Sequence, residues 1–333
     1  MISNNKMNVL FILSLVVIFV FTAAQGAFSQ EVFRLAHISD EEHPSHKGSV
    51  LFKELVEKRT DGKITVEIYP NSTLGSAPEY TEQMKLGAVD LGLSTSGQLQ
   101  VWVKEYGGIM IPFLFESYDH AHRALDGKAG ELLASLAEKE DFLVLANWEW
   151  GFRQITNNKL PINTPEDIGK LKMRVPNEIQ LQAMFEALGA TTSIVAFPEL
   201  YMALSQGVVD GQCNPLATIY HHKFYEVQKY LAITNHVYNT QMLIISKDAW
   251  NKLDADTQKI FQEAALEAGK KVRELTVSSE ESLVEEMKKK GTVVTYPDLA
   301  PFREKMQPAI DRIGEFTGVD FTKQFIQYVD EAR

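Results

Sequence analysis

The sequence predicts an α/β fold made of two similar lobes, with a cleft between them and one long helix shared by both. Three observations support this prediction: strand-like and helical segments alternate, one helix–strand pattern occurs twice, and a late helical stretch is longer than one small lobe. Alternating strands and helices are typical of α/β layers rather than of sandwiches or barrels of antiparallel strands. The chain has 333 residues, 45% hydrophobic and 23% charged. This is ordinary globular composition, with room for about two domains.

Residues 1–29 have the pattern of a signal peptide. Lys6 precedes an apolar run (9–24), and the small residues Ala27 and Ser29 stand at the −3 and −1 positions of a cleavage after Ser29. The alternative is an uncleaved anchor, but the run is shorter than the roughly 20 apolar residues that span a bilayer. We therefore expect the mature chain to be exported and soluble.

Strand and helix patterns begin directly after this segment. Residues 31–38 and 63–69 alternate apolar and polar side chains, as half-buried strands do. Between them apolar residues recur at helical spacing, and Asp61-Gly62 forms the turn that ends this helix. The opening is therefore β-α-β. The same rhythm predicts further strands at 142–146, 171–175 and 193–196.

One internal repeat supports the two-lobed prediction. The pattern Pro-Glu, seven residues, Gly-x-Val-Asp occurs at 78–90 and again at 198–210. Proline favours the first turn of a helix, glutamate suits a helix N-terminus, and glycine ends a helix. Coincidence is the alternative, because these signals are common. A true repeat implies two lobes that face each other, with the residues after Asp90 and Asp210 at the facing edges.

Residues 254–290 form the longest helical stretch, with an apolar stripe that begins at Phe261. At 1.5 Å per residue, about 35 residues reach roughly 50 Å, so we expect the helix to bridge both lobes unless it breaks near Ser278–Ser279. The predicted domain limits are residues 30–150 with 239–278 for lobe I, and 151–238 with 279–333 for lobe II.

Charge and cysteine content exclude several classes of protein. Lys+Arg 33 against Asp+Glu 44 gives a net charge of −11. Residues 1–29 hold one charge, Lys6, so the rest of the chain has 32 positive against 44 negative charges, a net charge of −12. Such an acidic chain is a poor nucleic-acid binder. Its one cysteine, Cys213, excludes an internal disulfide and a cysteine-based metal site.

Motifs for cofactors and metals are missing from the sequence. There is no Walker A loop and no Gly-x-Gly-x-x-Gly. The histidine pairs 120/122 and 221/222 lack the i,i+4 spacing that places two ligands on one helix face. We therefore expect no cofactor, no metal site and no catalytic residue.

Two arginines stand out between residues 147 and 177. Arg153 follows Trp148-Glu149-Trp150, and Arg174 lies in a short strand-like run between apolar neighbours. A buried arginine needs a partner, because burying an unpaired charge is costly. That partner is either an internal carboxylate or the carboxylate of a ligand, which a guanidinium matches with two parallel hydrogen bonds.

Five segments resemble the solute-binding proteins of TRAP (tripartite ATP-independent periplasmic) transporters, in the DctP-like group. They are Gly-Phe-Arg-Gln-Ile-Thr-Asn (151–157), Pro-Ile-Asn-Thr-Pro-Glu-Asp (161–167), Leu-Lys-Met-Arg-Val-Pro-Asn (171–177), Asp-Gly-Gln-Cys-Asn-Pro-Leu-Ala (210–217) and Lys-Phe-Tyr-Glu-Val-Gln-Lys-Tyr-Leu (223–231). The resemblance covers about 32–333. It implies a two-lobed, periplasmic-binding-protein-like receptor that closes over an organic acid in the periplasm and delivers it to the small and large membrane subunits of an ion-driven carrier.

The resemblance also implies site residues. Arg174 corresponds to the family arginine that pairs with the ligand carboxylate, and Asn214 to the asparagine at the same end of the ligand. Arg153 matches the arginine of Gly-x-Arg-Gln, Phe197 matches the aromatic residue that packs on the ligand, and Asn177 matches an asparagine of sialic-acid-binding members.

Departures from those members suggest a different ligand. His37 stands where they have asparagine, Thr95 where they have glutamate, and Cys213 replaces the commoner glutamate of Gln-Glu-Asn-Pro. The carboxylate end of the site thus resembles the family, whereas the end that contacts ligand hydroxyls differs. We expect Glu149, Glu79, His37 and Thr95 to contact these hydroxyls.

The sequence therefore predicts a monomeric receptor, not an enzyme, for a carboxylate-bearing sugar acid of the hexuronate type. A C4-dicarboxylate or sialic acid is the alternative ligand. A secreted hydrolase that uses Glu79 and Glu149 as a carboxylate pair is the alternative from another class of protein.

Overall fold

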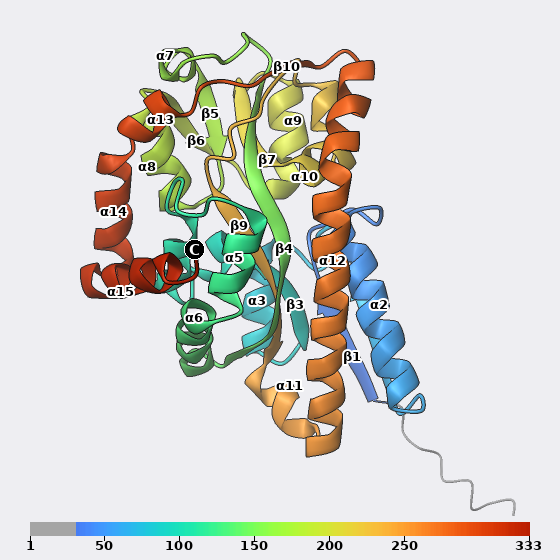
Figure 1. Cartoon of the computed structure of the whole chain (residues 1–333). Helices are drawn as coiled ribbons and strands as arrows, with labels where there is room; N and C mark the ends of the chain where they lie inside the picture. Colours follow the sequence, from blue (N-terminus) through green and yellow to red (C-terminus); the bar gives the residue numbers. More distant parts are fainter. Residues whose placement is uncertain (1–30) are drawn as a thin grey trace, which may run out of the picture.

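A computed structural model describes residues 31–333 as a two-lobed α/β fold around one ten-stranded sheet (Figure 1). The predicted signal peptide, residues 1–29, lies outside the described residues. The strands are β1 (Glu31–Ala36), β2 (Ile64–Tyr69), β3 (Leu91–Thr95), β4 (Phe142–Asn157), β5 (Lys172–Val175), β6 (Thr191–Ile194), β7 (Gly211–Pro215), β8 (Tyr230–Ala232), β9 (Tyr238–Ser246) and β10 (Val293–Thr295).

Helices pack on the sheet in both lobes. The longer ones are α2 (Pro44–Arg59), α3 (Ala77–Lys85), α5 (Tyr118–Leu125), α6 (Lys128–Lys139), α8 (Ile179–Ala187), α12 (Ala255–Lys289), α14 (Gln307–Thr317) and α15 (Val319–Asp330). The shorter ones are α4 (Ser96–Leu99), α7 (Pro165–Ile168), α9 (Leu200–Ser205), α10 (Leu216–His221), α11 (Lys247–Lys252), α13 (Ala300–Glu304) and the 3-10 turns η1 (Lys104–Met110), η2 (Phe197–Glu199) and η3 (Phe224–Glu226).

The sheet has the same arrangement in each lobe. Its strand order is β2-β1-β3-β9-β4-β7-β5-β6, with β8 and β10 off this path. In lobe I the strands β2, β1 and β3 are parallel, and β9 runs antiparallel to β3. In lobe II the strands β6, β5 and β7 are parallel, and β4 runs antiparallel to β7. The two lobes therefore meet along the β4–β9 pair.

The sequence repeat corresponds to equivalent structures in the two lobes. Gly87 and Gly207 end their helices at φ of 73° and 70°, in the left-handed region that glycine tolerates. Asp90 accepts the backbone N–H of Arg34 at 2.8 Å, and Asp210 accepts that of Lys172 at 2.9 Å. Each aspartate thus fastens the strand that follows it to its parallel neighbour. The repeat fixes the same strand register in both lobes.

Strand β4 is longer than predicted and belongs to both lobes. It pairs with β9 from Phe142 to Phe152 and with β7 from Arg153 to Asn157. A register shift between Glu149 and Gly151 comes just before this change of partner, and Gly151 has φ of 116°. The sequence prediction stopped at residue 146 because aromatic and charged residues interrupt the alternation there.

Helix α12 is unbroken over 35 residues and runs along both lobes, as predicted (Figure 1). Its first half buries Phe261, Ala268 and Val272 in the core of lobe I, and its second half buries Leu283 and Met287 in the core of lobe II. The serines at 278–279 do not break the helix, since their hydroxyls donate to backbone carbonyls one turn earlier. One rigid element therefore supports both lobes.

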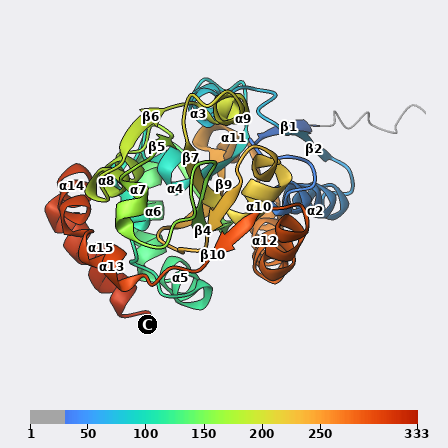
Figure 2. The same ribbon diagram turned by 90° about the horizontal axis from the view of Figure 1, so that it is seen from above.

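The C-terminal segment differs from the prediction that 279–333 returns to lobe II. Strand β10 pairs with β8 in lobe II, but Phe325 and Val329 of α15 pack in the lobe I core with Ala121 and Leu125. Figures 1 and 2 show α13, α14 and α15 on the side of the molecule opposite α12. The apolar face of α15 is apparent from the sequence, whereas the lobe that it covers depends on long-range packing.

We expect Gly48→Ala to destabilise the fold although alanine favours helices. A Cβ at Gly48 would lie 2.2 Å from Val272 Cγ2 and 3.1 Å from the Trp148 ring, where α2 crosses α12. Overpacking of this kind costs about 1–3 kcal/mol, more than the helix propensity gained. The control is Gly314→Ala in α14, whose new Cβ would have 3.8 Å to its nearest neighbour. Chemical denaturation should show a loss for the first variant and a small gain for the second; two gains would contradict the close crossing.

Candidate functional site

A cleft with a volume of about 300 Å³ lies between the lobes, at the carboxyl ends of their parallel strands. This edge is where open α/β sheets bind ligands. Residues from both lobes and from β4 form its walls: Ile38, Ser76, Ala77, Pro78, Thr95, Gly97, Gln98, Val101, Trp150, Arg153, Arg174, Pro176, Asn177, Glu178, Ile194, Ala196, Phe197 and Asn214. Six of the nine predicted site residues are among them: Arg174, Asn214, Arg153, Phe197, Thr95 and Asn177.

Arg174, on β5, carries a buried charge with spare hydrogen-bonding capacity. Its side chain is 2% exposed; Nε donates to the Val195 carbonyl at 2.9 Å, and Nη2 has no partner among the described residues. Burial, and then the charge of Arg153, lower the pKa of Arg174 to about 10, so the guanidinium stays protonated at neutral pH. A buried donor without a partner is costly, which makes Nη2 a place for an anionic ligand atom.

Arg153, on β4, is held by the next strand rather than by a carboxylate. Its Nη2 donates to the Cys213 carbonyl, and its Nε lies 3.2 Å from Cys213 Sγ. Burial raises the pKa of the Cys213 thiol, so the thiol stays neutral at pH 7. The two arginines therefore bring two positive charges into the cleft.

The other predicted residues that line the cleft have ordered surroundings. Asn214 Nδ2 donates to Gln212 Oε1 at 2.5 Å. The ring of Phe197 is edge-on to that of His222, with 4.8 Å between centroids. Thr95 and Asn214 lie near the ends of β3 and β7, as expected for the residues after Asp90 and Asp210.

Sequence reasoning missed several wall residues, of which Glu178 carries a charge. Glu178 is the N-cap residue of α8 and is 5% exposed, and its Oε2 has no partner within residues 31–333. Burial raises the pKa of this carboxyl group, while Arg153 and Arg174 act in the opposite direction. Its position directly after a parallel strand was the available signal. Trp150 and Gln98 were missed as well.

His37 and Glu79 lie outside this cleft, which corrects the prediction for both. His37 is fully buried, and its Nε2 lies 3.2 Å from Nδ1 of His46 on α2. Its neighbour Ile38 lines the cleft, so the alternation of side chains turns His37 away. Glu79 is exposed, and its Oε2 accepts the backbone N–H of Ser76 at 2.6 Å, which caps α3.

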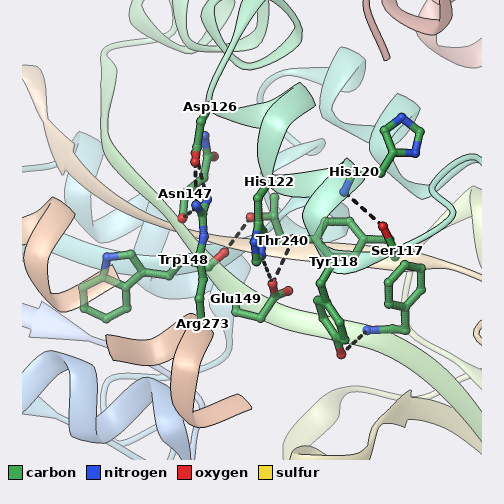
Figure 3. Close-up of polar contacts among 12 residues, drawn as sticks. Ser117, Tyr118, His120, His122, Asp126, Asn147, Trp148, Glu149, Thr240 and Arg273 are labelled. Atoms are coloured by element: carbon green, nitrogen blue, oxygen red, sulfur yellow. Dashed lines mark hydrogen bonds and ion pairs between the residues drawn. The ribbon is translucent and has the colours of Figure 1, made fainter. Parts of the chain in front are cut away.

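Glu149 also lies outside the cleft, in a buried polar network (Figure 3). Its Oε2 lies 2.6 Å from His122 Nε2 and accepts from the Tyr238 hydroxyl at 3.2 Å. Burial raises the pKa of Glu149, whereas His122 and then Arg273 favour its ionised form. Its neighbour Trp150 lines the cleft instead. Glu149 therefore belongs to the contact between β4 and α5. The hydrolase alternative required Glu149 and Glu79 to form a carboxylate pair, but the two residues share no cleft.

Tyr118 extends the same network to the long helix. Its hydroxyl donates to Oε1 of Glu280 on α12 at 2.5 Å and accepts the backbone N–H of Phe152 on β4 at 3.3 Å. Arg273, on the same helix and closer to its N-terminus than Glu280, pairs with Asp126 through two hydrogen bonds of 2.5 and 2.8 Å. These contacts tie α12 to the strand that both lobes share.

Two further observations concern residues 31–333. They contain no group of three histidine, cysteine, aspartate or glutamate side chains that could hold a metal ion. No helix in this part of the chain combines the length and apolar character that crossing a membrane requires.

The fold and the cleft are those of a bacterial solute receptor. The model of the DctP family, "Bacterial extracellular solute-binding protein, family 7", matches residues 35–316, and the chain belongs to this family of TRAP transport receptors. The sialic acid-binding periplasmic protein SiaP of Vibrio cholerae is 36% identical over 264 residues, 79% of this chain and 82% of SiaP. The C4-dicarboxylate-binding periplasmic protein DctP of Rhodobacter capsulatus is 33% identical over 296 residues, 87% and 88% of the two chains.

Solved structures agree with this assignment. A TRAP periplasmic solute-binding protein from Roseobacter denitrificans, with bound β-D-glucuronate, superimposes with a TM-score of 0.86 at 29% identity, over 90% of this chain and 99% of that one. The family consists of transport receptors rather than enzymes.

We expect Glu280→Gln to stabilise the protein more at pH 8 than at pH 5. Burial, and then the charge of Glu149, raise the pKa of Glu280 to about 7, against a hydrogen bond from Tyr118 that lowers it. A native pKa above the unfolded value means that stability falls as pH rises from about 4.5 to about 7. Glutamine avoids the cost of ionisation, on the order of 1 kcal/mol at pH 8, and keeps an oxygen for Tyr118.

Thermal melts at both pH values test this, with the exposed Glu281→Gln on the same helix as the control. The control should shift the melting temperature little at either pH. An equal effect of Glu280→Gln at the two pH values would contradict the raised pKa.

Proposed function

We propose that this TRAP solute receptor binds a hydroxylated sugar acid of the hexuronate type, with Arg174 as the main partner of the ligand carboxylate. The observation that carries the proposal is the buried, unpartnered Nη2 of Arg174, in the same cleft as a second buried guanidinium. In this proposal Arg153 adds charge, Asn214 orients the carboxylate, and Phe197 packs on the carbon skeleton.

The polar groups of the cleft support a ligand with several hydroxyls. Thr95, Gln98 and Asn177 line the walls, and hydroxyl and amide side chains both donate and accept hydrogen bonds. A site built to bind hydroxyls rejects ligands that lack them, because its own polar groups are then left unpaired. The Roseobacter neighbour with bound glucuronate is consistent with this class of ligand.

The proposal extends to location and partners. Cleavage after Ser29 would release the receptor into the periplasm, where it would act as a monomer and deliver its ligand to the small and large membrane subunits. The periplasmic names of the relatives support this location. The same two names keep sialic acid and C4-dicarboxylates as the competing ligands.

A ligand panel tests the proposed class. We expect calorimetric titration to show glucuronate or galacturonate binding at least about tenfold tighter than succinate, malate or sialic acid, since each hydrogen bond left unpaired in a dry cleft costs 1 kcal/mol or more. Nanomolar binding of succinate or sialic acid, with uronates silent, would reject the ligand class and leave the receptor assignment intact.

Arg174 variants test the carboxylate contact. Arg174→Ala should weaken binding of the preferred acid by about 2–5 kcal/mol, because a charge-assisted contact in a closed cleft is lost. Arg174→Lys should also bind poorly, since an ammonium group cannot reproduce the planar fork. The control is Arg312→Lys, an exposed arginine paired with Glu186 in the same lobe. Near-native affinity of Arg174→Lys would move the carboxylate contact to Arg153.

A further inference from the structure

Glu178 is the one acidic residue among the side chains that line the cleft in residues 31–333. It shares the cleft with Arg153 and Arg174, and all three side chains are almost fully buried. With Glu178 ionised, the charges of these three groups sum to +1. One ligand carboxylate therefore neutralises the cleft, a dianion leaves it at −1, and a zwitterion leaves it at +1.

Two buried atoms in this cleft have no partner within residues 31–333, and one is a hydrogen-bond donor whereas the other is an acceptor. Arg174 Nη2 is a donor in need of an acceptor, and Glu178 Oε2 is an acceptor in need of a donor. A carboxylate alone satisfies only the arginine. A ligand that carries both a carboxylate and a hydroxyl group satisfies both atoms, and the hydroxyl adds no charge next to the arginines.

The opposite lobe covers Glu178. A Cβ at Gly97, in the α4 turn of lobe I, would lie 2.3 Å from Glu178 Cδ and 2.4 Å from its Oε1, so only glycine leaves room for the carboxylate. Nearby, Gln180 of lobe II donates to Gln100 Oε1 of lobe I at 2.7 Å. Contact between the lobes therefore removes water from Glu178, and a ligand group must replace that water.

We propose that Glu178 is a specificity-determining residue, which accepts a hydrogen bond from a ligand hydroxyl and excludes dicarboxylates by repelling a second carboxylate. This inference rests on the proposed function, and it narrows the ligand to a hydroxylated monocarboxylic acid. Like charges repel strongly where water is excluded, so Glu178 discriminates against succinate more strongly than the loss of hydroxyl contacts alone.

The test is calorimetric titration of glucuronate and succinate into the wild type, Glu178→Gln and Glu178→Asp. Glutamine has the same shape without the charge, so succinate should bind about tenfold more tightly and glucuronate several-fold more weakly than to the wild type. Aspartate keeps the charge but not the reach, so it should weaken glucuronate and still exclude succinate. The control is Glu199→Gln, an exposed residue of lobe II outside the cleft walls.

The outcomes separate this inference from the proposed function. A wild type that prefers succinate rejects both. A wild type that prefers glucuronate, with the same ratio of the two dissociation constants in Glu178→Gln, overturns the role of Glu178 alone. Glu178→Gln leaves the two buried guanidinium groups without a carboxylate beside them, so the melting temperature of each variant is measured first. The readout is the ratio of the two dissociation constants within one variant, which a shared loss of folded protein does not change.

Discussion

Strand β4 is part of the sheet in both lobes, and its change of partner after Phe152 is the constraint on which the cleft depends. Before that point the strand is paired with β9, and after it with β7. Trp150, at the register shift, and Arg153, the first residue paired with β7, both line the cleft. Helix α12 supports the same junction from outside, where Trp148 donates to the Ala265 carbonyl at 2.9 Å. The position of Arg153 in the cleft wall is thus set by the element that joins the lobes.

Buried charge is the second constraint, and the protein distributes it into two separate systems. Glu149, His122 and Arg273 lie behind the shared strand and outside the cleft walls, and the charges of His122 and Arg273 favour the ionised form of Glu149 (Figure 3). Arg153, Arg174 and Glu178 line the cleft, and Arg174 Nη2 and Glu178 Oε2 have no partner in the part of the chain that the structure describes. The first system supports the junction between the lobes, and the second is available for recognition.

The sequence predicted the architecture better than the orientation of individual side chains. The repeat, the long helix and the family segments predicted two facing lobes and brought six residues to one cleft. The predictions for His37 and Glu149 share one difficulty: each residue lies in a run of consecutive buried residues (35–39 and 148–157), where alternation does not tell which neighbour points to the cleft. Their neighbours Ile38 and Trp150 are the wall residues. The sequence did not predict Glu178 as a cleft residue, because its buried position depends on Gly97, which is distant in the sequence.

The incomplete pairing of Arg174 and Glu178 also bears on the conformation of the receptor without a ligand. With the lobes in contact and no solute between them, a donor and an acceptor are both deprived of water, at a cost of about 1–3 kcal/mol each. That cost shifts the unloaded population towards the form in which the lobes stand apart and water returns to both atoms. The closed form is then populated mainly by receptors that hold a ligand. A membrane carrier that binds only the closed form would therefore seldom bind an unloaded receptor.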